Sequence, residues 1–202
     1  MCGRVRLSSD VSEIKLVFSI PPHRPTPNFA PSWNAAPTDQ LPVVRFDAKA
    51  GERSLDLTRW GLVPFWSKDI KVGFANINAK AEGIESKPAF REAFQRRRCL
   101  VPVDNFYEWK KTATGKQPYA IALADKALMA LAGLWENWRS PAGEWVRSFA
   151  ISSPRPRTSC APSFTTVCQW SLVPRRGPPG SERSLPMPAS SRLCSRPIRR
   201  QE

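Results

Sequence analysis

Histidine is almost absent from this chain, and paired cysteines and long apolar runs are missing. One of its 202 residues is histidine, His23, and the five cysteines include no C-x-x-C pair. Zinc sites use these two residue types at close spacing, so the sequence argues against a metal centre and predicts no cofactor. No apolar stretch approaches the roughly 20 residues of a membrane helix, and no apolar run follows Arg4 and Arg6 as in a signal peptide. We therefore expect a cytoplasmic protein without a membrane partner.

Positive charge is abundant instead. The net charge is +14, the isoelectric point is about 10.3, and eight residues are tryptophan. This balance favours a polyanionic partner, nucleic acid first, although a merely basic surface is the alternative. Aromatic faces beside cations suit single-stranded nucleic acid in particular.

The character of the chain changes near residue 152. Residues 1–152 have the composition of one globular domain, whereas residues 153–202 are rich in Ser, Pro and Arg and lack hydrophobic periodicity. The second segment holds nine arginines, no lysine and two acids, which is half of the net charge. Such a composition predicts a non-native or disordered tail.

The domain itself predicts a mixture of many strands and few helices. DVSEIKLVFSI, with Asp10 as N-cap, and SKPAFREAFQRRR predict two short helices. The turns DAKAGE, ATGK and SPAGE separate several of the expected strands. Those strands are LPVVRFD, SLDLTRWGLVPFW, CLVPVDNFYEWKK, QPYAIAL, LMALAGLWENW and EWVRSFAIS.

Cys2 raises a chemical possibility at the start of the chain, MCGR. Aminopeptidases generally remove Met1 when the next residue is small, which would leave a cysteine with a free α-amine. The amine has a pKa of about 8 and the thiol a pKa of about 8.5, so reactive forms of both exist near neutrality. Together they can condense with an aldehyde to a five-membered thiazolidine, and an abasic site in DNA presents an aldehyde when its sugar opens. A cysteine at position 2 is by itself more often incidental.

Further motifs change that reading. MCGR, RWGLVPFW, NAKAE, KPAFREAFQRRRCLVPVDNFYEWK, KQPY and LAGLWENW occur in this order. The set resembles the SOS response-associated peptidase family, also called abasic-site-processing or SRAP-domain proteins, over roughly residues 1–152. The resemblance implies an α+β fold, with a curved, barrel-like, mainly antiparallel sheet and flanking helices. The implied partner is single-stranded DNA that contains abasic sites.

The resemblance assigns three catalytic residues. Cys2 matches the cysteine whose amine and thiol crosslink to the abasic sugar. Asn78, which opens NAKAE, matches an asparagine that hydrogen-bonds near the linkage. Glu108, in NFYEW, matches the glutamate that acts as general acid and base, a role favoured when partial burial raises a carboxyl pKa. An exposed strand carboxylate is the alternative for Glu108.

It also assigns four DNA-binding residues. Arg4 matches a phosphate-contacting arginine, and Lys80 stands where arginine is usual, so a bidentate clamp becomes a point charge. Trp66 matches an aromatic wedge against the bases beside the lesion, although a core tryptophan is equally expected there. Asn34, in WNAAPT, matches an asparagine that supports the pocket.

One catalytic group of the family is missing. Members carry a histidine in an L-H-[ND]-R-M-P stretch after the strand that matches SFAIS, and His23 matches no motif. Codons shifted to begin at the third base of the written ones permit L-H-N-R-M-P-V-V-L, ending at Leu172. We therefore expect a frameshift, in the gene or in its sequencing, between about Ser152 and Arg157. A chain made as written would lack the histidine and a layer of its core, and would be poorly stable.

Three functions remain open from the sequence. The first is a DNA-repair protein that crosslinks abasic sites through Cys2 and associates with the nucleoid when bound to DNA. The second is a cysteine peptidase with an N-terminal nucleophile that at least removes its own first residue. The third is an inactive remnant, or a module that only binds single-stranded DNA.

Overall fold

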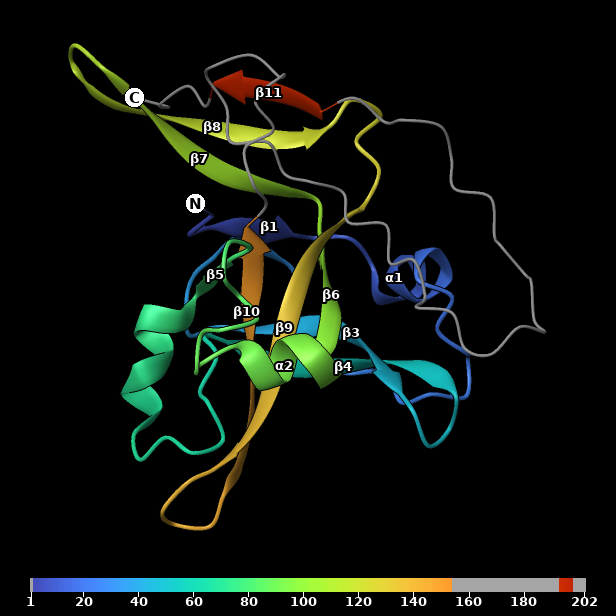
Figure 1. Cartoon of the computed structure of the whole chain (residues 1–202). Helices are drawn as coiled ribbons and strands as arrows, with labels where there is room; N and C mark the ends of the chain where they lie inside the picture. Colours follow the sequence, from blue (N-terminus) through green and yellow to red (C-terminus); the bar gives the residue numbers. More distant parts are fainter. Residues whose placement is uncertain (1, 154–192, 198–202) are drawn as a thin grey trace, which may run out of the picture.

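The computed structural model describes residues 2–153 and 193–197, which form two β-sheets with short helices beside them (Figure 1). One sheet has five strands in the order β11-β8-β7-β1-β2, and the other has six in the order β4-β3-β6-β9-β10-β5. The elements are β1 (Val5–Leu7), α1 (Val11–Val17), β2 (Ser32–Ala35), β3 (Gln40–Asp47), β4 (Glu52–Trp60), the 3-10 helix η1 (Ile70–Asn76), β5 (Asn78–Lys80), α2 (Arg91–Arg96), β6 (Arg98–Val103), β7 (Asn105–Thr112), β8 (Gly115–Leu123), β9 (Met129–Arg139), β10 (Trp145–Ser153) and β11 (Leu193–Pro197).

The six-stranded sheet closes on itself. Its strands pair antiparallel from β4 through β3, β6 and β9 to β10, and β10 then pairs with β4 in parallel, with Phe149 opposite Trp60. The short strand β5 adds to β10 in parallel, with Asn78 opposite Ile151. Closure of a sheet removes its unpaired edges. The predicted α+β fold with a barrel-like, mainly antiparallel sheet is confirmed.

Several local predictions are also confirmed. The Asp10 carboxylate caps α1 by accepting a hydrogen bond from the backbone N–H of Ser12 at 2.7 Å. The turns that the sequence predicts at DAKAGE, ATGK and SPAGE join β3 to β4, β7 to β8 and β9 to β10. The second helix begins at Arg91, later than predicted, because the residues before it form turns.

Two strands are shorter than the sequence predicts. The expected strand over SLDLTRWGLVPFW ends at Trp60, because Gly61 adopts a φ of +119°, a conformation open to glycine but strained for other residues. The expected strand over CLVPVDNFYEWKK is divided at Asp104 into β6 and β7, which belong to different sheets. The β6–β7 junction therefore links the barrel to the second sheet.

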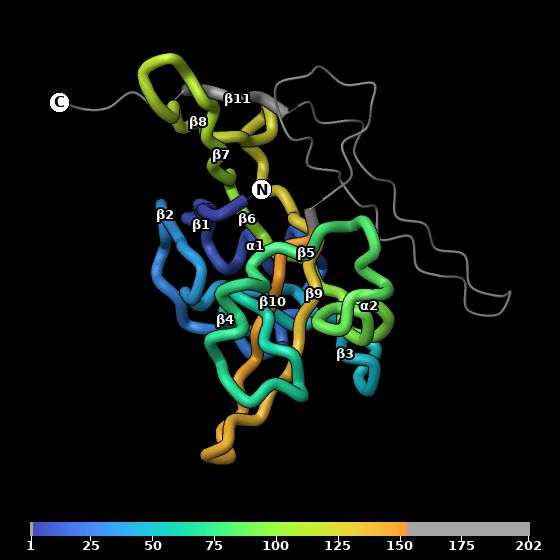
Figure 2. The backbone as a smooth tube through the Cα atoms, turned by 60° about the vertical axis from the view of Figure 1, so that its left-hand side comes forward, coloured from blue at the N-terminus to red at the C-terminus, as the bar shows by residue number. Residues whose placement is uncertain are grey.

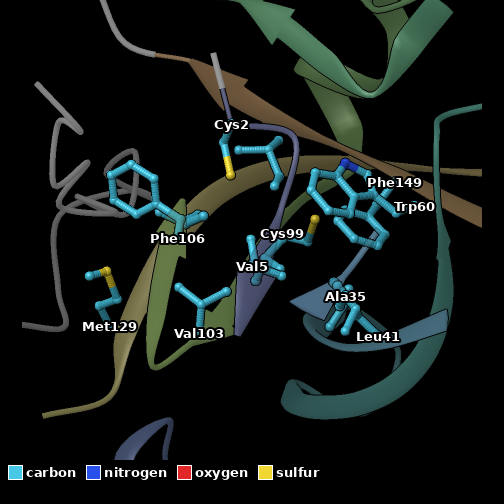
Figure 3. Close-up of a cluster of buried hydrophobic side chains, with 14 of the residues drawn as sticks. Cys2, Val5, Ala35, Leu41, Trp60, Cys99, Val103, Phe106, Met129 and Phe149 are labelled. Carbon is cyan, nitrogen blue, oxygen red and sulfur yellow. The ribbon is translucent and has the colours of Figure 1, made fainter. Parts of the chain in front are cut away.

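The main core lies inside the barrel and extends under the second sheet. Trp60 and Phe149 stack there with their ring centroids 6.2 Å apart, and both side chains are fully buried. Figure 3 shows this cluster, with Phe106 and Cys2 on the side opposite the two stacked rings. Cys99 is a free thiol buried in the same cluster.

The tail predicted to be non-native or disordered, residues 153–202, lies mostly outside the described residues. Within it, Leu193–Pro197 form β11, which pairs antiparallel with β8. The proposed shift of reading frame and the region of the missing histidine also lie outside the described residues. Among the helices that the structure describes, none is long and apolar enough to cross a membrane.

Candidate active site around Cys2

The strand β1 carries Cys2 to the junction of the two sheets. It lies between β2 and β7, and its residue Val5 is opposite both Ala35 and Phe106. The backbone N–H of Tyr107 donates to the carbonyl of Arg4 at 2.9 Å, which continues the ladder toward the N-terminus. In Figures 1 and 2 the N-terminus lies between β5 and the β7–β8 hairpin.

Asp104 fixes the other end of β1. One carboxylate oxygen accepts from the backbone N–H of Ser8 at 2.6 Å and from its hydroxyl at 2.7 Å, and the other accepts from the hydroxyl of Ser9 at 2.7 Å. Its backbone N–H donates to the carbonyl of Arg6 at 2.9 Å. A three-residue strand makes few ladder bonds, and a slip of one residue would reverse its faces. These bonds therefore hold the register that positions Cys2.

The Cys2 thiol is buried in the main core. The residue is 8% exposed, and its sulfur points into the cluster in Figure 3. Burial raises the pKa of the thiol to about 12, and a backbone hydrogen bond of Arg4 opposes part of that increase. The thiol itself donates to the Arg4 carbonyl at 3.4 Å. At neutral pH the group is therefore a thiol, and it must lose its proton during any reaction in which its sulfur is the nucleophile.

Asn78 contacts Cys2 directly. Its amide nitrogen donates to the Cys2 carbonyl at 2.7 Å, a contact that joins residues 76 apart in the sequence. The amide oxygen of Asn78 is buried and accepts no hydrogen bond from any described residue. A buried acceptor without a donor is unfavourable by about 1–3 kcal/mol, so this oxygen suits a donor on a ligand or on a modified Cys2.

Glu108 lies near the same thiol. It follows Phe106 on β7 by two residues, so the period of the strand places both side chains on the face that covers Cys2. Its negative charge adds to the effect of burial in raising the Cys2 pKa. The side chain is half-buried, not the fully exposed strand carboxylate of the alternative interpretation. The three predicted catalytic residues thus converge from the N-terminus, β5 and β7.

Among the four predicted DNA-binding residues, Arg4 contacts Cys2, because its backbone carbonyl accepts the hydrogen bond of the thiol. Arg4 is half-buried, and Lys80 is exposed on the same face of β5 as Asn78. Asn34 is exposed on β2, the edge strand of the second sheet. Trp66 is 54% exposed, which excludes the core alternative for this tryptophan.

The loop that carries Trp66 is held rigidly at both ends. A Cβ atom on Gly61 would lie 2.7 Å from the carbonyl oxygen of Gly73, so the two backbones meet where only glycine fits. Farther along, the indole N–H of Trp138 donates to the carbonyl of Ser67 at 2.7 Å. The exposed tryptophan is therefore presented by a fixed segment.

The single histidine lies elsewhere. His23 is 66% exposed at its side chain and lies 2.9 Å from Glu52, at the first residue of β4. Glu52 and Trp60 are the two ends of β4 and lie about 26 Å apart along the strand. Cys2 packs in the same buried cluster as Trp60, at the far end from His23. His23 therefore cannot exchange a proton with Cys2. Over residues 2–153 and 193–197, no three His, Cys, Asp or Glu side chains are grouped as a metal site would require.

Asp104 is the positioning residue that the sequence interpretation missed. An acid directly after a buried strand, together with the pair Ser8–Ser9 after another, was the available signal. Nothing in the sequence placed these segments side by side, because 95 residues separate Ser9 from Asp104.

Comparisons with known proteins find matches over most of the chain. The family model described as SOS response associated peptidase (SRAP) matches residues 1–162. Abasic site processing protein YoqW of Bacillus subtilis is 38% identical over 157 residues, which cover 77% of this chain and 69% of the relative. YoaM of the same species, named likewise, is 40% identical over 77% of this chain and 68% of its own. HMCES of Xenopus tropicalis, also named an abasic site processing protein, is 30% identical over 61% of this chain and 45% of its own.

Solved structures share the fold. A protein from Bordetella bronchiseptica superposes with a TM-score of 0.69 at 21% identity, covering 98% of this chain and 100% of its own. A protein from Bacteroides thetaiotaomicron superposes with a TM-score of 0.68 at 22% identity, covering 76% of this chain and 68% of its own. The family match over most of the chain and the identity to several relatives lead to one conclusion. The chain belongs to the SOS response associated peptidase (SRAP) family.

Proposed function

We propose that this protein processes abasic sites in single-stranded DNA by forming a covalent bond through Cys2. The convergence of Cys2, Asn78 and Glu108 is the observation that carries the proposal. Three relatives carry the name abasic site processing protein, which supports the same substrate.

The chemistry begins after removal of Met1. The α-amine of Cys2 attacks C1′ of the opened abasic sugar, and loss of one water gives a Schiff base. The Cys2 sulfur then adds to the imine carbon, its proton passes to the nitrogen, and a thiazolidine ring closes. Burial keeps the thiol protonated before this step, and Glu108 is the nearby carboxylate that can relay the proton.

Asn78 has a positioning role in this scheme. By donating to the Cys2 carbonyl it fixes the backbone from which both reacting groups extend. Its buried oxygen, which no described residue reaches with a donor, can accept from the Cys2 amine or from a sugar hydroxyl. Arg4 and Lys80 would bind phosphates, Trp66 would stack on a base, and Asn34 would support the pocket.

A crosslinking assay tests the proposal. Purified protein is incubated with a single-stranded oligonucleotide that holds one abasic site, and a heat-stable adduct is sought on a denaturing gel. We expect an adduct from wild type and from the buried-thiol control Cys99→Ala, and none from Cys2→Ala. Cys2→Ser keeps the amine, so it should give only an adduct that borohydride must trap.

Two other results would favour the rival functions. Binding of the oligonucleotide with no adduct in wild type would support a non-catalytic binding module. Cleavage of peptide substrates by Cys2 without any DNA adduct would support a peptidase. Either result would overturn the crosslinking proposal.

We also propose that the chain leaves the reading frame of its family between about residues 152 and 157. The family match extends only to residue 162. Near residues 164–172, codons in the shifted frame can encode the histidine stretch of the family. Resequencing the locus tests this idea, since an intact single frame would contradict it. The restored chain should crosslink faster and melt higher than the chain as written.

A further inference from the structure

The tip of the β7–β8 hairpin carries unbalanced positive charge. Its residues Lys110–Gln117 include three lysines and no acid, and all three lysines are exposed. Throughout residues 2–153, no ion pair involves any of these lysines. The hairpin projects away from the barrel in both views (Figures 1 and 2).

The strand register makes this charge unfavourable for folding. Lys111 and Lys116 are directly opposite one another, where like charges repel across the strands. The β3–β4 hairpin contains the reverse case, because Asp47 and Glu52 are also directly opposite. There Arg24 neutralises the pair, at 2.8 Å from Asp47 and 3.7 Å from Glu52. The lysine pair has no such counter-ion among the described residues, so an anion from outside the chain would complete it.

The hairpin is continuous with the candidate active site. Lys110 follows Glu108 by two residues, so it shares the face of that carboxylate about 7 Å farther along the strand. Trp109 is 43% exposed, and the alternation of β7 places it on the other face with Lys111. A nucleic acid strand bound at Glu108 would therefore lie close to Lys110 on one face of the hairpin and to Trp109 and Lys111 on the other.

We infer that this hairpin is an arm that binds the phosphates of single-stranded DNA beside the abasic nucleotide. The inference rests on the proposed function. Lysines hold the backbone as point charges, and an exposed tryptophan among them suits the unstacked bases of a single strand. Repulsion between Lys111 and Lys116 in the free protein is relieved when phosphate binds, so part of the binding energy comes from the hairpin itself.

The test measures salt dependence with undamaged single-stranded DNA, which cannot crosslink. Affinity is compared from 50 to 200 mM salt for wild type and for the variant Lys110→Gln/Lys111→Gln/Lys116→Gln. Each lost phosphate contact lowers the slope of log affinity against log salt by about 0.7, so the slope should fall by about 2. Affinity at low salt should fall at least about tenfold.

A matched variant controls for net charge. Lys49→Gln/Lys87→Gln/Lys126→Gln removes the same charge from three separate connecting segments, and we expect the wild-type slope. The hairpin variant should melt at or above the wild-type temperature, because it loses a repulsive pair. An unchanged slope in the hairpin variant, or an equal fall in both variants, would overturn the inference. If wild type crosslinks abasic DNA in that case, the proposed function stands without it.

Discussion

The surroundings of Cys2 and the surface next to them differ in almost every physical property. Cys2 is 8% exposed and is held by Asn78 and by a strand that Asp104 fixes, so its surroundings are desolvated and its position is fixed. Trp66 is 54% exposed, and the hairpin lysines are exposed and carry excess charge. Under the proposed function, reaction and binding would therefore be separable in this molecule. Substitutions in the first region should change rate constants, and those in the second should change affinity.

The largest effect should come from Glu108→Gln. Glutamine keeps the size of the side chain but cannot relay a proton to or from the buried thiol. We expect the crosslinking rate at saturating DNA to fall about 10²–10⁴-fold, with the dissociation constant within about twofold of wild type. Rapid-quench gels give the rate and fluorescence anisotropy gives the affinity. Glu144→Gln, an exposed glutamate beside the β9–β10 turn, is the control and should be unchanged. A large loss of affinity in Glu108→Gln would contradict the assignment of reaction to one region and binding to the other.

Asp104→Asn should lower both stability and rate. An asparagine cannot accept the three hydrogen bonds from Ser8 and Ser9 with the same geometry, and each unsatisfied donor is unfavourable by about 1–3 kcal/mol. Asp56→Asn is a matched control, because Asp56 binds Arg45 and contacts no residue of β1. Both variants should melt lower, but only Asp104→Asn should slow crosslinking, by about tenfold if Cys2 is misplaced by an ångström or less. Equal rates in the two variants would show that Asp104 has a structural role alone.

These predictions depend on contacts that the sequence could indicate only in part. The Asp10 cap and the three turns are local, so their residue types predicted them correctly. The end of β4 at Gly61 depends on the backbone of Gly73, and the break at Asp104 depends on bonds to Ser8 and Ser9. Such contacts join segments that are distant along the chain, and no local pattern encodes them.

The candidate site follows the same rule. Motifs carried the identities of Cys2, Asn78 and Glu108 through the family resemblance, and the structure brings them together. The parallel pairing of β5 with β10, which places Asn78 beside Cys2, could not be deduced from periodicity, because a three-residue strand has almost none.

Trp66→Ala should affect binding alone. Loss of one stacked base is unfavourable by about 1–3 kcal/mol, so affinity for single-stranded DNA should fall about tenfold or more. The rate at saturating DNA should remain at the wild-type value, because the proposed role of Trp66 is to stack on a base and not to take part in the reaction. Trp145→Ala, which removes an exposed tryptophan at the start of β10, should leave both quantities unchanged. A fall in the saturating rate of Trp66→Ala would place this side chain in the reaction.

A smaller effect concerns acid stability. Burial is the largest single influence on the Asp104 pKa and raises it. The hydrogen bonds from Ser9 and Ser8 and the charge of Arg6 together outweigh burial, so the pKa is lowered in the folded protein. The contribution of Asp104 is therefore complete above the unfolded value of about 3.9 and is lost as the pH falls through the lower folded pKa. Wild type should lose stability more steeply than Asp104→Asn below about pH 4, as measured by urea unfolding at a series of pH values. Parallel curves would show that the carboxylate is not coupled to folding.

Mass spectrometry of the purified adduct tests the covalent role of Cys2 most directly. The intact mass should equal that of the chain without Met1 plus the abasic oligonucleotide, less one molecule of water. After digestion, the crosslinked peptide should begin at Cys2, with both its nitrogen and its sulfur blocked to alkylation. An adduct that retains Met1, or one linked through a lysine such as Lys80, would contradict the assignment of Cys2 as the reacting residue.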